Sequence, residues 1–429
     1  MNTKNLFFIA IALFGLSMSG IAQKVEPTAD EFGLMKGFPP AEDKMVDAYN
    51  WTMYPFNRWA FMNVQRIHST AFIDNGAQTP YEFEKEIVNL DKLTIPVEGD
   101  KDYQLKEILD THNTDAFVVI HKGKLVYERY WNNMTPYQPH WMASTSKSVI
   151  GTVAAILVER GVLDENKTVK EIIPELAESG FADATVRQVL DMTAGTAWDE
   201  SMSELLDPTS KARQYGAAAN SWKIKGYEGS GVFDFLPSIE QDRKHGDVFI
   251  YNSPQADLMG WILGRVTGKT VEQNVSDELW RHLGPEGDSY YLIDGAGFAW
   301  PTGGLSSNAY DLAKFGVLMQ QNGIFNGKRI FPESITKDIL ENGDTGAFAK
   351  GSHAWAYPEG AYRNYWWVTN NEDQAYMAKG MFGQYIYINP TQEVVIIRFA
   401  SEKVSVDKER TKQVESAFDE ISRYLNSSK

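Results

Sequence analysis

The pattern of apolar and polar positions changes in character twice along the chain. Residues 116–121 and 124–130 are strand-like runs on either side of Lys122-Gly123, which predicts a β-hairpin. An apolar run over 149–158 stops near Gly161, which predicts a buried helix that ends at a glycine. Strand-like runs return late in the chain, before a final amphipathic pattern, at 365–368, 384–388, 393–399 and 408–425.

Strands therefore come first, helices follow, and strands and a helix close the chain. This order predicts an α/β (α+β) fold in which an antiparallel sheet is flanked by N- and C-terminal helices. We assign residues 101–142 and 300–429 to the sheet part and 143–299 to an inserted helical lobe. Residues 23–100, irregular and punctuated by proline, are expected to wrap over the core, and 195–247, rich in glycine and aromatics, to form loops.

Helix signals between the two strand regions are local and specific. Ser253-Pro254 predicts the N-cap and first position of a helix that ends at Gly268. Apolar spacing predicts further helices over 271–283 and 310–321. These segments give the inserted lobe its helical character.

The N-terminus has the pattern of a secretory signal peptide over residues 1–22. Lys4 supplies a positive charge, residues 6–16 are apolar, and Gly20-Ile21-Ala22 predicts cleavage after Ala22. The apolar run is short for a membrane span, and no cysteine near the cleavage point could carry a lipid. We therefore expect a periplasmic or secreted protein with no membrane anchor after cleavage.

Composition excludes several classes of chemistry. The formal net charge of −16 argues against binding to nucleic acid or to an anionic membrane surface. The absence of cysteine excludes disulfides and thiol nucleophiles. The sequence has no His-Glu-x-x-His spacing, P-loop or dinucleotide fingerprint, so we expect neither a metal nor a cofactor. It also lacks the Gly-x-Ser-x-Gly elbow of α/β-hydrolases.

The candidate chemistry lies at the start of the buried helix, in Ser144 and Lys147. Positions three apart lie on one face of a helix, so the hydroxyl and the amine can meet. An apolar environment favours the neutral amine, which could accept the serine proton. The simple alternative is that Ser144 only caps the helix. A second pair with this spacing, Ser334 and Lys337, follows Pro332 and is interpreted as a helix cap.

Two further motifs follow in order, Phe249-Ile250-Tyr251-Asn252-Ser253-Pro254 and Ala378-Lys379-Gly380-Met381-Phe382-Gly383-Gln384. With Ser144-Thr145-Ser146-Lys147, they resemble the serine β-lactamase and penicillin-binding-protein superfamily. Within it, the chain resembles the class C-related branch of 6-aminohexanoate-dimer hydrolases and esterases. Supporting matches stand at Asn57-Arg58-Trp59, at 190–195 and at 302–307. The resemblance implies a β-lactamase-like catalytic domain over 101–429.

The resemblance also implies a role for each residue. Ser144 would be the acylated nucleophile, Lys147 its activator, and Tyr251 a proton shuttle to the leaving group. The backbone N–H groups of Ser144 and Met381 would form the oxyanion hole. The positions expected to contact substrate are Gly380, Gly383, Ser253 and Trp198.

Two departures from the family pattern bear on the substrate. Ser253 stands where the second motif has Asn, and Ala378-Lys379-Gly380 replaces Lys-Thr-Gly. In β-lactamases those side chains help to hold the drug, so the variant pattern favours an amide or ester hydrolase. We therefore expect an exported serine hydrolase that cleaves a small-molecule amide or ester through an acyl-enzyme. The alternatives are a non-catalytic binding or sensor protein, and a cell-wall D-Ala peptidase or β-lactamase.

Overall fold

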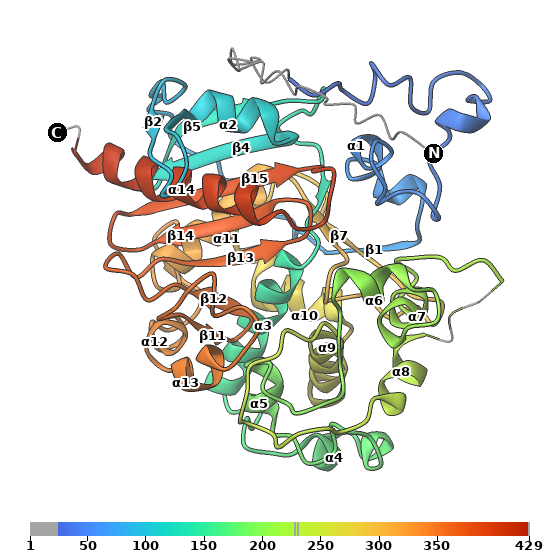
Figure 1. The fold of residues 1–429 in the computed structure, drawn as a ribbon. Coiled ribbons are helices and arrows are strands. Elements are labelled where there is room, and N and C mark those ends of the chain that lie inside the picture. The colour runs from blue at the N-terminus through green and yellow to red at the C-terminus, as the bar shows by residue number, and fades with distance from the viewer. Residues whose placement is uncertain (1–24, 227–228, 230, 428–429) are drawn as a thin grey trace, which may run out of the picture.

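The computed structural model describes residues 25–226, 229 and 231–427, so the predicted signal peptide lies outside the described residues. Its main sheet has seven antiparallel strands in the order β11-β12-β13-β14-β15-β4-β5 (Figure 1). The two early strands are the predicted hairpin, and the other five come from the end of the chain. Their bounds are β4 Thr114–His121, β5 Lys124–Tyr130, β11 Ala361–Arg363, β12 Trp366–Val368, β13 Tyr376–Gly380, β14 Gln384–Asn389 and β15 Val394–Ala400.

Helices cover both faces of this sheet, which is why β14 and β15 are buried at every position. The C-terminal helix α14 (Lys408–Ser427) lies across one face, where Phe418 packs on the Tyr385 ring at 5.2 Å (Figure 1). Helix α11 (Ala309–Gln320) lies on the other face. It approaches so closely that a Cβ on Gly316 would lie 2.4 Å from Val395. The predicted fold class is confirmed.

The helical part is arranged around α3 (Thr145–Glu159), which contacts α9 (Pro254–Thr267), α10 (Val271–Glu278) and strand β13. All but its last two residues are buried, as the apolar run predicts. The chain leaves α3 through Gly161, whose φ of +70° is the left-handed conformation that favours glycine. The small helices of this part are α4 Val169–Ile172, α5 Val186–Leu190 and the 3₁₀ turns Pro174–Leu176 and Trp280–His282.

The structure corrects several local predictions. Residues 195–247 were expected to be loops but contain α6 (Met202–Leu206), α7 (Lys211–Ala218) and α8 (Val232–Phe235). The small and aromatic residues of α7 and α8 pack on the core, and that burial outweighs the local glycine signals. Ser334 is the first residue of α12 (Ser334–Glu341) rather than its N-cap, which is Glu333.

A second sheet was not predicted. It has four short antiparallel strands in the order β1-β7-β8-β6. Strands of two or three residues are too short to show an alternation of apolar and polar positions in the sequence. The bounds are β1 Thr70–Phe72, β7 Tyr290–Leu292, β8 Leu305–Ser307 and β6 His140–Trp141. Because β6 ends shortly before Ser144, this sheet fixes the direction from which the chain enters α3.

The remaining elements are short helices, turns and strands, and the strands form two two-stranded sheets, β2-β3 and β9-β10. They are α1 Asn57–Ala60, α2 Leu105–Thr111, α13 Thr345–Ala349, β2 Thr94–Ile95, β3 Tyr103–Gln104, β9 Ile324–Phe325, β10 Lys328–Arg329, and 3₁₀ turns at Glu42–Lys44, Val64–Arg66 and Leu236–Ser238. Across the described residues, we find no helix with both the length and the apolar character needed to cross a bilayer.

The close packing of α3 can be tested at Gly151, with Gly264 of α9 as a control. A Cβ on Gly151 of α3 would lie 2.2 Å from the backbone oxygen of Asn364, whereas one on Gly264 of α9 would meet nothing closer than 3.5 Å. We expect Gly151→Ala to lower the free energy of unfolding by about 1–3 kcal/mol through overpacking. Gly264→Ala should raise it by up to about 1 kcal/mol, because alanine is the better helix former. Urea denaturation measures both, and equal effects would contradict the close contact.

Candidate active site

The predicted pair meets at the start of α3. The Lys147 Nζ donates hydrogen bonds to Ser144 Oγ at 2.8 Å and to the Thr302 carbonyl at 2.9 Å. Ser144 occupies the N-cap position, but its side chain makes no capping hydrogen bond. The preceding residue, Ala143, has a φ of +47°, a left-handed conformation that costs an alanine roughly 1–3 kcal/mol. The hydroxyl therefore faces the lysine instead of closing the helix.

Lys147 is fully buried, and this changes its protonation. Burial lowers the pKa of Lys147 to about 8, while the charges of Glu200 and Asp257 act in the opposite direction. The second pair, Ser334 and Lys337, has no such environment, because the Lys337 side chain is 63% exposed and lies 3.9 Å from Glu341. Burial separates two pairs that sequence spacing alone does not distinguish.

Neither of the two carboxylates near Lys147 was predicted. Asp257 lies on α9, accepts a hydrogen bond of 3.1 Å from the Thr302 backbone N–H and another from the Tyr215 hydroxyl. Burial raises the pKa of Asp257 to about 7. Burial also raises the pKa of Glu200, against the opposing effect of the Lys147 charge. Both acids supply negative potential that favours the protonated form of Lys147.

Tyr251 lies next to both members of the pair. A side-chain hydrogen bond links the two residues, and the Tyr251 ring centroid is 5.0 Å from the Lys147 Nζ. Its ring stacks on Trp367 at 5.5 Å with an interplanar angle of 19°, and His353 lies 5.9 Å away. Burial raises the pKa of Tyr251 above its usual range, so the phenol stays protonated at neutral pH.

The segment that carries Tyr251 is held by the supporting motif at 190–195 and by Thr196, which follows it. The Ile250 N–H donates to the Met192 carbonyl at 3.1 Å, and the Asn252 side chain donates to Thr196 Oγ1 at 2.8 Å. Asn252 is 1% exposed, so this contact is protected from water. These contacts hold Tyr251 in place beside Ser144.

The third motif contains two glycines in crowded places, of which Gly380 faces the segment just before Ser144. A Cβ on Gly380, at the end of β13, would lie 2.6 Å from the Met142 carbonyl, so only glycine lets this strand come so close. Gly383 has a φ of +88°, and a Cβ there would lie 2.2 Å from Arg398 Nη1. Met381 lies between them, on the hairpin from β13 to β14.

All the predicted positions except Lys147 line one cavity of about 480 Å³. Ser253 donates to Glu200 from its backbone N–H at 3.0 Å and from its hydroxyl at 3.2 Å, and Trp198 Nε1 donates to the same carboxylate at 2.8 Å. Ser253 and Pro254 occupy the predicted N-cap and first positions of α9, but the Ser253 hydroxyl makes no capping hydrogen bond. The predicted residues in the lining are Ser144, Tyr251, Met381, Gly380, Gly383, Ser253 and Trp198.

The side chains around the third motif are already engaged. The Lys379 Nζ donates to the Tyr357 hydroxyl at 2.7 Å and forms an ion pair of 2.6 Å with Glu415 on α14. Ala378, where the family pattern has Lys, is fully buried. Within the part of the chain that the structure describes, no group of three or more His, Asp or Glu side chains is placed to hold a metal ion.

Comparison with known proteins identifies the group to which this site belongs. A family model described as Beta-lactamase matches residues 106–417. The chain belongs to the beta-lactamase family. The 6-aminohexanoate-dimer hydrolase of Paenarthrobacter ureafaciens is 31% identical over 353 residues, which cover 82% of this chain and 87% of that protein. This beta-lactamase-family chain is a serine hydrolase of the amidase or esterase type.

Solved structures support the same assignment. A candidate 6-aminohexanoate-dimer hydrolase from Bacillus anthracis superposes with a TM-score of 0.82 at 31% identity, covering 90% of this chain and 99% of the other. A class C beta-lactamase from Rhodobacter sphaeroides gives a TM-score of 0.51 at 15% identity, covering 75% of this chain and 97% of the other, and shows the shared fold. The predicted family resemblance is confirmed.

The pKa of Lys147 gives a direct test of the pair. We expect the rate at which a fluorophosphonate labels Ser144 to rise as the pH increases through about 8, because the reaction needs neutral Lys147. Lys147→Met should remove this rise and slow labelling by roughly 10²–10⁴-fold. The labelling rate is measured as a function of pH, and peptide mapping confirms that Ser144 is the labelled residue. A wild-type rate that does not change with pH would contradict the assignment.

Two further variants serve as controls for that titration. Glu200→Gln removes a negative charge that favours protonated Lys147, so the midpoint of the labelling curve should move to lower pH. Ser334→Ala changes the exposed pair and should leave both the midpoint and the rate unchanged.

Proposed function

We propose that this protein is an exported serine hydrolase that cleaves an amide or ester bond in a small molecule through an acyl-enzyme on Ser144. The observation that carries the proposal is the 2.8 Å contact between Ser144 Oγ and a buried lysine amine with a pKa of about 8. A neutral amine at this distance is a base for the serine hydroxyl. The signal-peptide pattern in the sequence of residues 1–22 supports export.

Acylation begins with proton transfer from Ser144 to neutral Lys147. The Oγ attacks the substrate carbonyl carbon, and the carbonyl oxygen becomes an oxyanion that the backbone N–H groups of Ser144 and Met381 bind. Each such donor contributes about 3–4 kcal/mol to the stability of the transition state. The close approach that Gly380 permits supports this placement of Met381.

Collapse of the tetrahedral intermediate needs a proton on the leaving group. Tyr251 donates it, and the proton that Lys147 took from Ser144 replaces it on the phenol. The raised pKa of Tyr251 supports this role, because the group begins protonated. A water molecule then attacks the acyl carbon and gives up its proton along the same route, so that Ser144 regains its hydrogen and the acid product leaves.

The surroundings of the site support a linear amide or ester as substrate rather than a β-lactam. The protein from Paenarthrobacter ureafaciens named as a 6-aminohexanoate-dimer hydrolase supports a short amide. The hydroxyl of Ser253 is bonded to Glu200, and Lys379 is paired with Glu415, so neither is free for a β-lactam. The cavity of about 480 Å³ suits a molecule of drug-like size.

The proposal is tested first by removing the nucleophile. We expect the wild-type protein to hydrolyse short esters and linear amides, and Ser144→Ala to lose at least roughly 10³-fold in kcat. Liquid chromatography of the hydrolysis products measures turnover by the wild type and by Ser144→Ala. Turnover that survives in Ser144→Ala would show that another group performs the reaction.

β-Lactams separate the proposal from its alternatives. We expect nitrocefin and a fluorescent penicillin to be turned over at least roughly 10²-fold more slowly than a short ester, because the groups at Ser253 and Lys379 are engaged. A stable stoichiometric Ser144 adduct without turnover of any ester would favour a sensor protein. Rapid hydrolysis of nitrocefin would favour a β-lactamase.

A further inference from the structure

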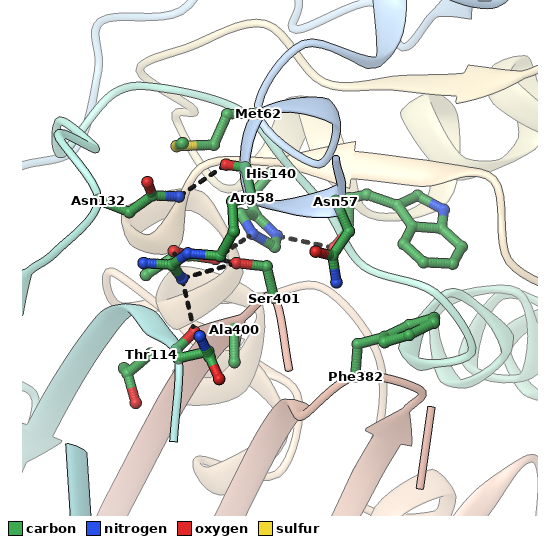
Figure 2. Close-up of polar contacts among 12 residues, drawn as sticks. Asn57, Arg58, Met62, Thr114, Asn132, His140, Phe382, Ala400 and Ser401 are labelled. Carbon is green, nitrogen blue, oxygen red and sulfur yellow. Dashed lines mark hydrogen bonds and ion pairs between the residues drawn. The ribbon is translucent and has the colours of Figure 1, made fainter. Parts of the chain in front are cut away.

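A buried polar cluster joins the N-terminal segment to the main sheet, away from the catalytic cavity. Arg58 of α1 is 2% exposed and forms an ion pair of 2.8 Å with Asp115 of β4. The same Nη1 atom donates to Ser401 Oγ at 2.8 Å, and the Ser401 hydroxyl donates to the other Asp115 oxygen at 2.6 Å. Figure 2 shows Arg58 lying between His140 and Ser401, with Asn132 beside its backbone.

One side of this cluster reaches the strand that leads to Ser144. His140 Nε2 lies 3.2 Å from Asp115 Oδ2, and its Nδ1 lies 2.8 Å from the Trp141 carbonyl. The Trp141 N–H donates to the Phe61 carbonyl at 2.8 Å, directly after α1. The position of β6, and with it the entry to α3, is therefore set against α1 and Asp115.

The other side reaches the hairpin that carries Met381. Asn57, which is adjacent to Arg58 and fully buried, donates to the Glu402 carbonyl at 2.8 Å. The Glu402 N–H in turn donates to the Phe382 carbonyl at 3.4 Å, and the Phe382 N–H donates to the Ser405 carbonyl at 2.8 Å. Phe382 follows Met381 directly, and Figure 2 labels both Phe382 and Asn57.

Ring contacts join the two sides. The Phe61 ring lies 4.8 Å from Trp141 and 5.3 Å from Phe382, and Trp141 lies 6.3 Å from Phe382. These aromatic residues fill the space between β6 and the hairpin. A change in the polar cluster would therefore be transmitted to the relative position of both chain segments.

We propose that Asn57 and Arg58 are positioning residues for the oxyanion hole, because α1 sets the separation between the backbone N–H groups of Ser144 and Met381. This inference rests on the proposed function. The two residues lie before the region 106–417 that the family model matches, so a segment outside the matched core supplies this alignment. Substrate does not contact them; they act through His140 and Glu402.

A purely structural role is the competing explanation, and energetics weigh against it. A buried ion pair contributes little net stability compared with apolar residues of the same volume, because both charges lose their hydration. The geometry that it imposes is its main effect at this position. An oxyanion hole is sensitive to such geometry, since displacement of about 1 Å can cost roughly 10²-fold in rate.

The test compares two buried asparagines. Asn57→Ala removes the donor to the Glu402 carbonyl, while Asn274→Ala on α10 removes donors to the Lys269 and Thr270 carbonyls. Asn57 is fully buried and Asn274 is 1% exposed, and each has an unpartnered Oδ1, so the expected losses in stability are similar. Ser401→Ala is the smaller second variant, should Asn57→Ala fail to fold.

The readouts are kcat, KM and the affinity for an arylboronic acid, which forms a tetrahedral adduct with Ser144 and places an oxygen in the oxyanion hole. We expect Asn57→Ala and Ser401→Ala to lower kcat roughly tenfold to a hundredfold, to weaken boronate binding by the same factor, and to leave KM within about twofold. Asn274→Ala should lower the melting temperature alone. Rescue of kcat is not expected from added salt or lower temperature.

The outcomes are distinct for the two proposals. If the Asn57 and Ser401 variants lose stability like Asn274→Ala but keep kcat and boronate affinity, the positioning role is wrong and the hydrolase assignment stands. If the wild type shows no hydrolysis that depends on Ser144, both proposals are wrong. Parallel loss of kcat and boronate affinity in the two cluster variants supports both.

Discussion

The structure depends on one constraint, which is that the Lys147 amine must be kept out of water within hydrogen-bond distance of Ser144. Its partners are a hydroxyl and the Thr302 carbonyl, and neither carries a charge that would hold the ammonium form. Burial therefore lowers the pKa of Lys147 to about 8 and makes the amine available as a base. The packing of α3 between α9, α10 and the sheet serves this end, because any gap beside the amine would admit water.

The features that could be predicted from the sequence are those with a local signal. The buried helix and α9 each have an apolar run that stops at a glycine, and the hairpin at 116–130 has two apolar runs on either side of Lys122-Gly123. Ser144, Lys147 and Tyr251 could be named because three motifs occur in a fixed order. The four-stranded second sheet and the short helices α6, α7 and α8 could not, because their periods are too short and packing decides their form.

The unpredicted part of the site depends on contacts between distant segments. Glu200 lies in an irregular stretch with no motif, and its proximity to Lys147 exists only in the fold. Asp257 had a readable signal, since it is a carboxylate among apolar residues at the start of a helix and is fully buried. Arg58 and Ser401 are 343 residues apart, so no spacing argument could pair them.

The central pairing of β4 with β15 has a consequence for the order of events during synthesis and folding. His121 of β4 pairs with Val394 of β15, so the chain between them, which includes the whole helical part, forms a loop that this contact closes. Contacts between such distant residues are slow to form, because the entropy of loop closure is lost before the contact returns any energy. The hairpin with Met381 and the loop with Ser401 join the fold in that same step. A nascent chain consequently contains Ser144 and Lys147 long before the hairpin with Met381 can pack against the start of α3.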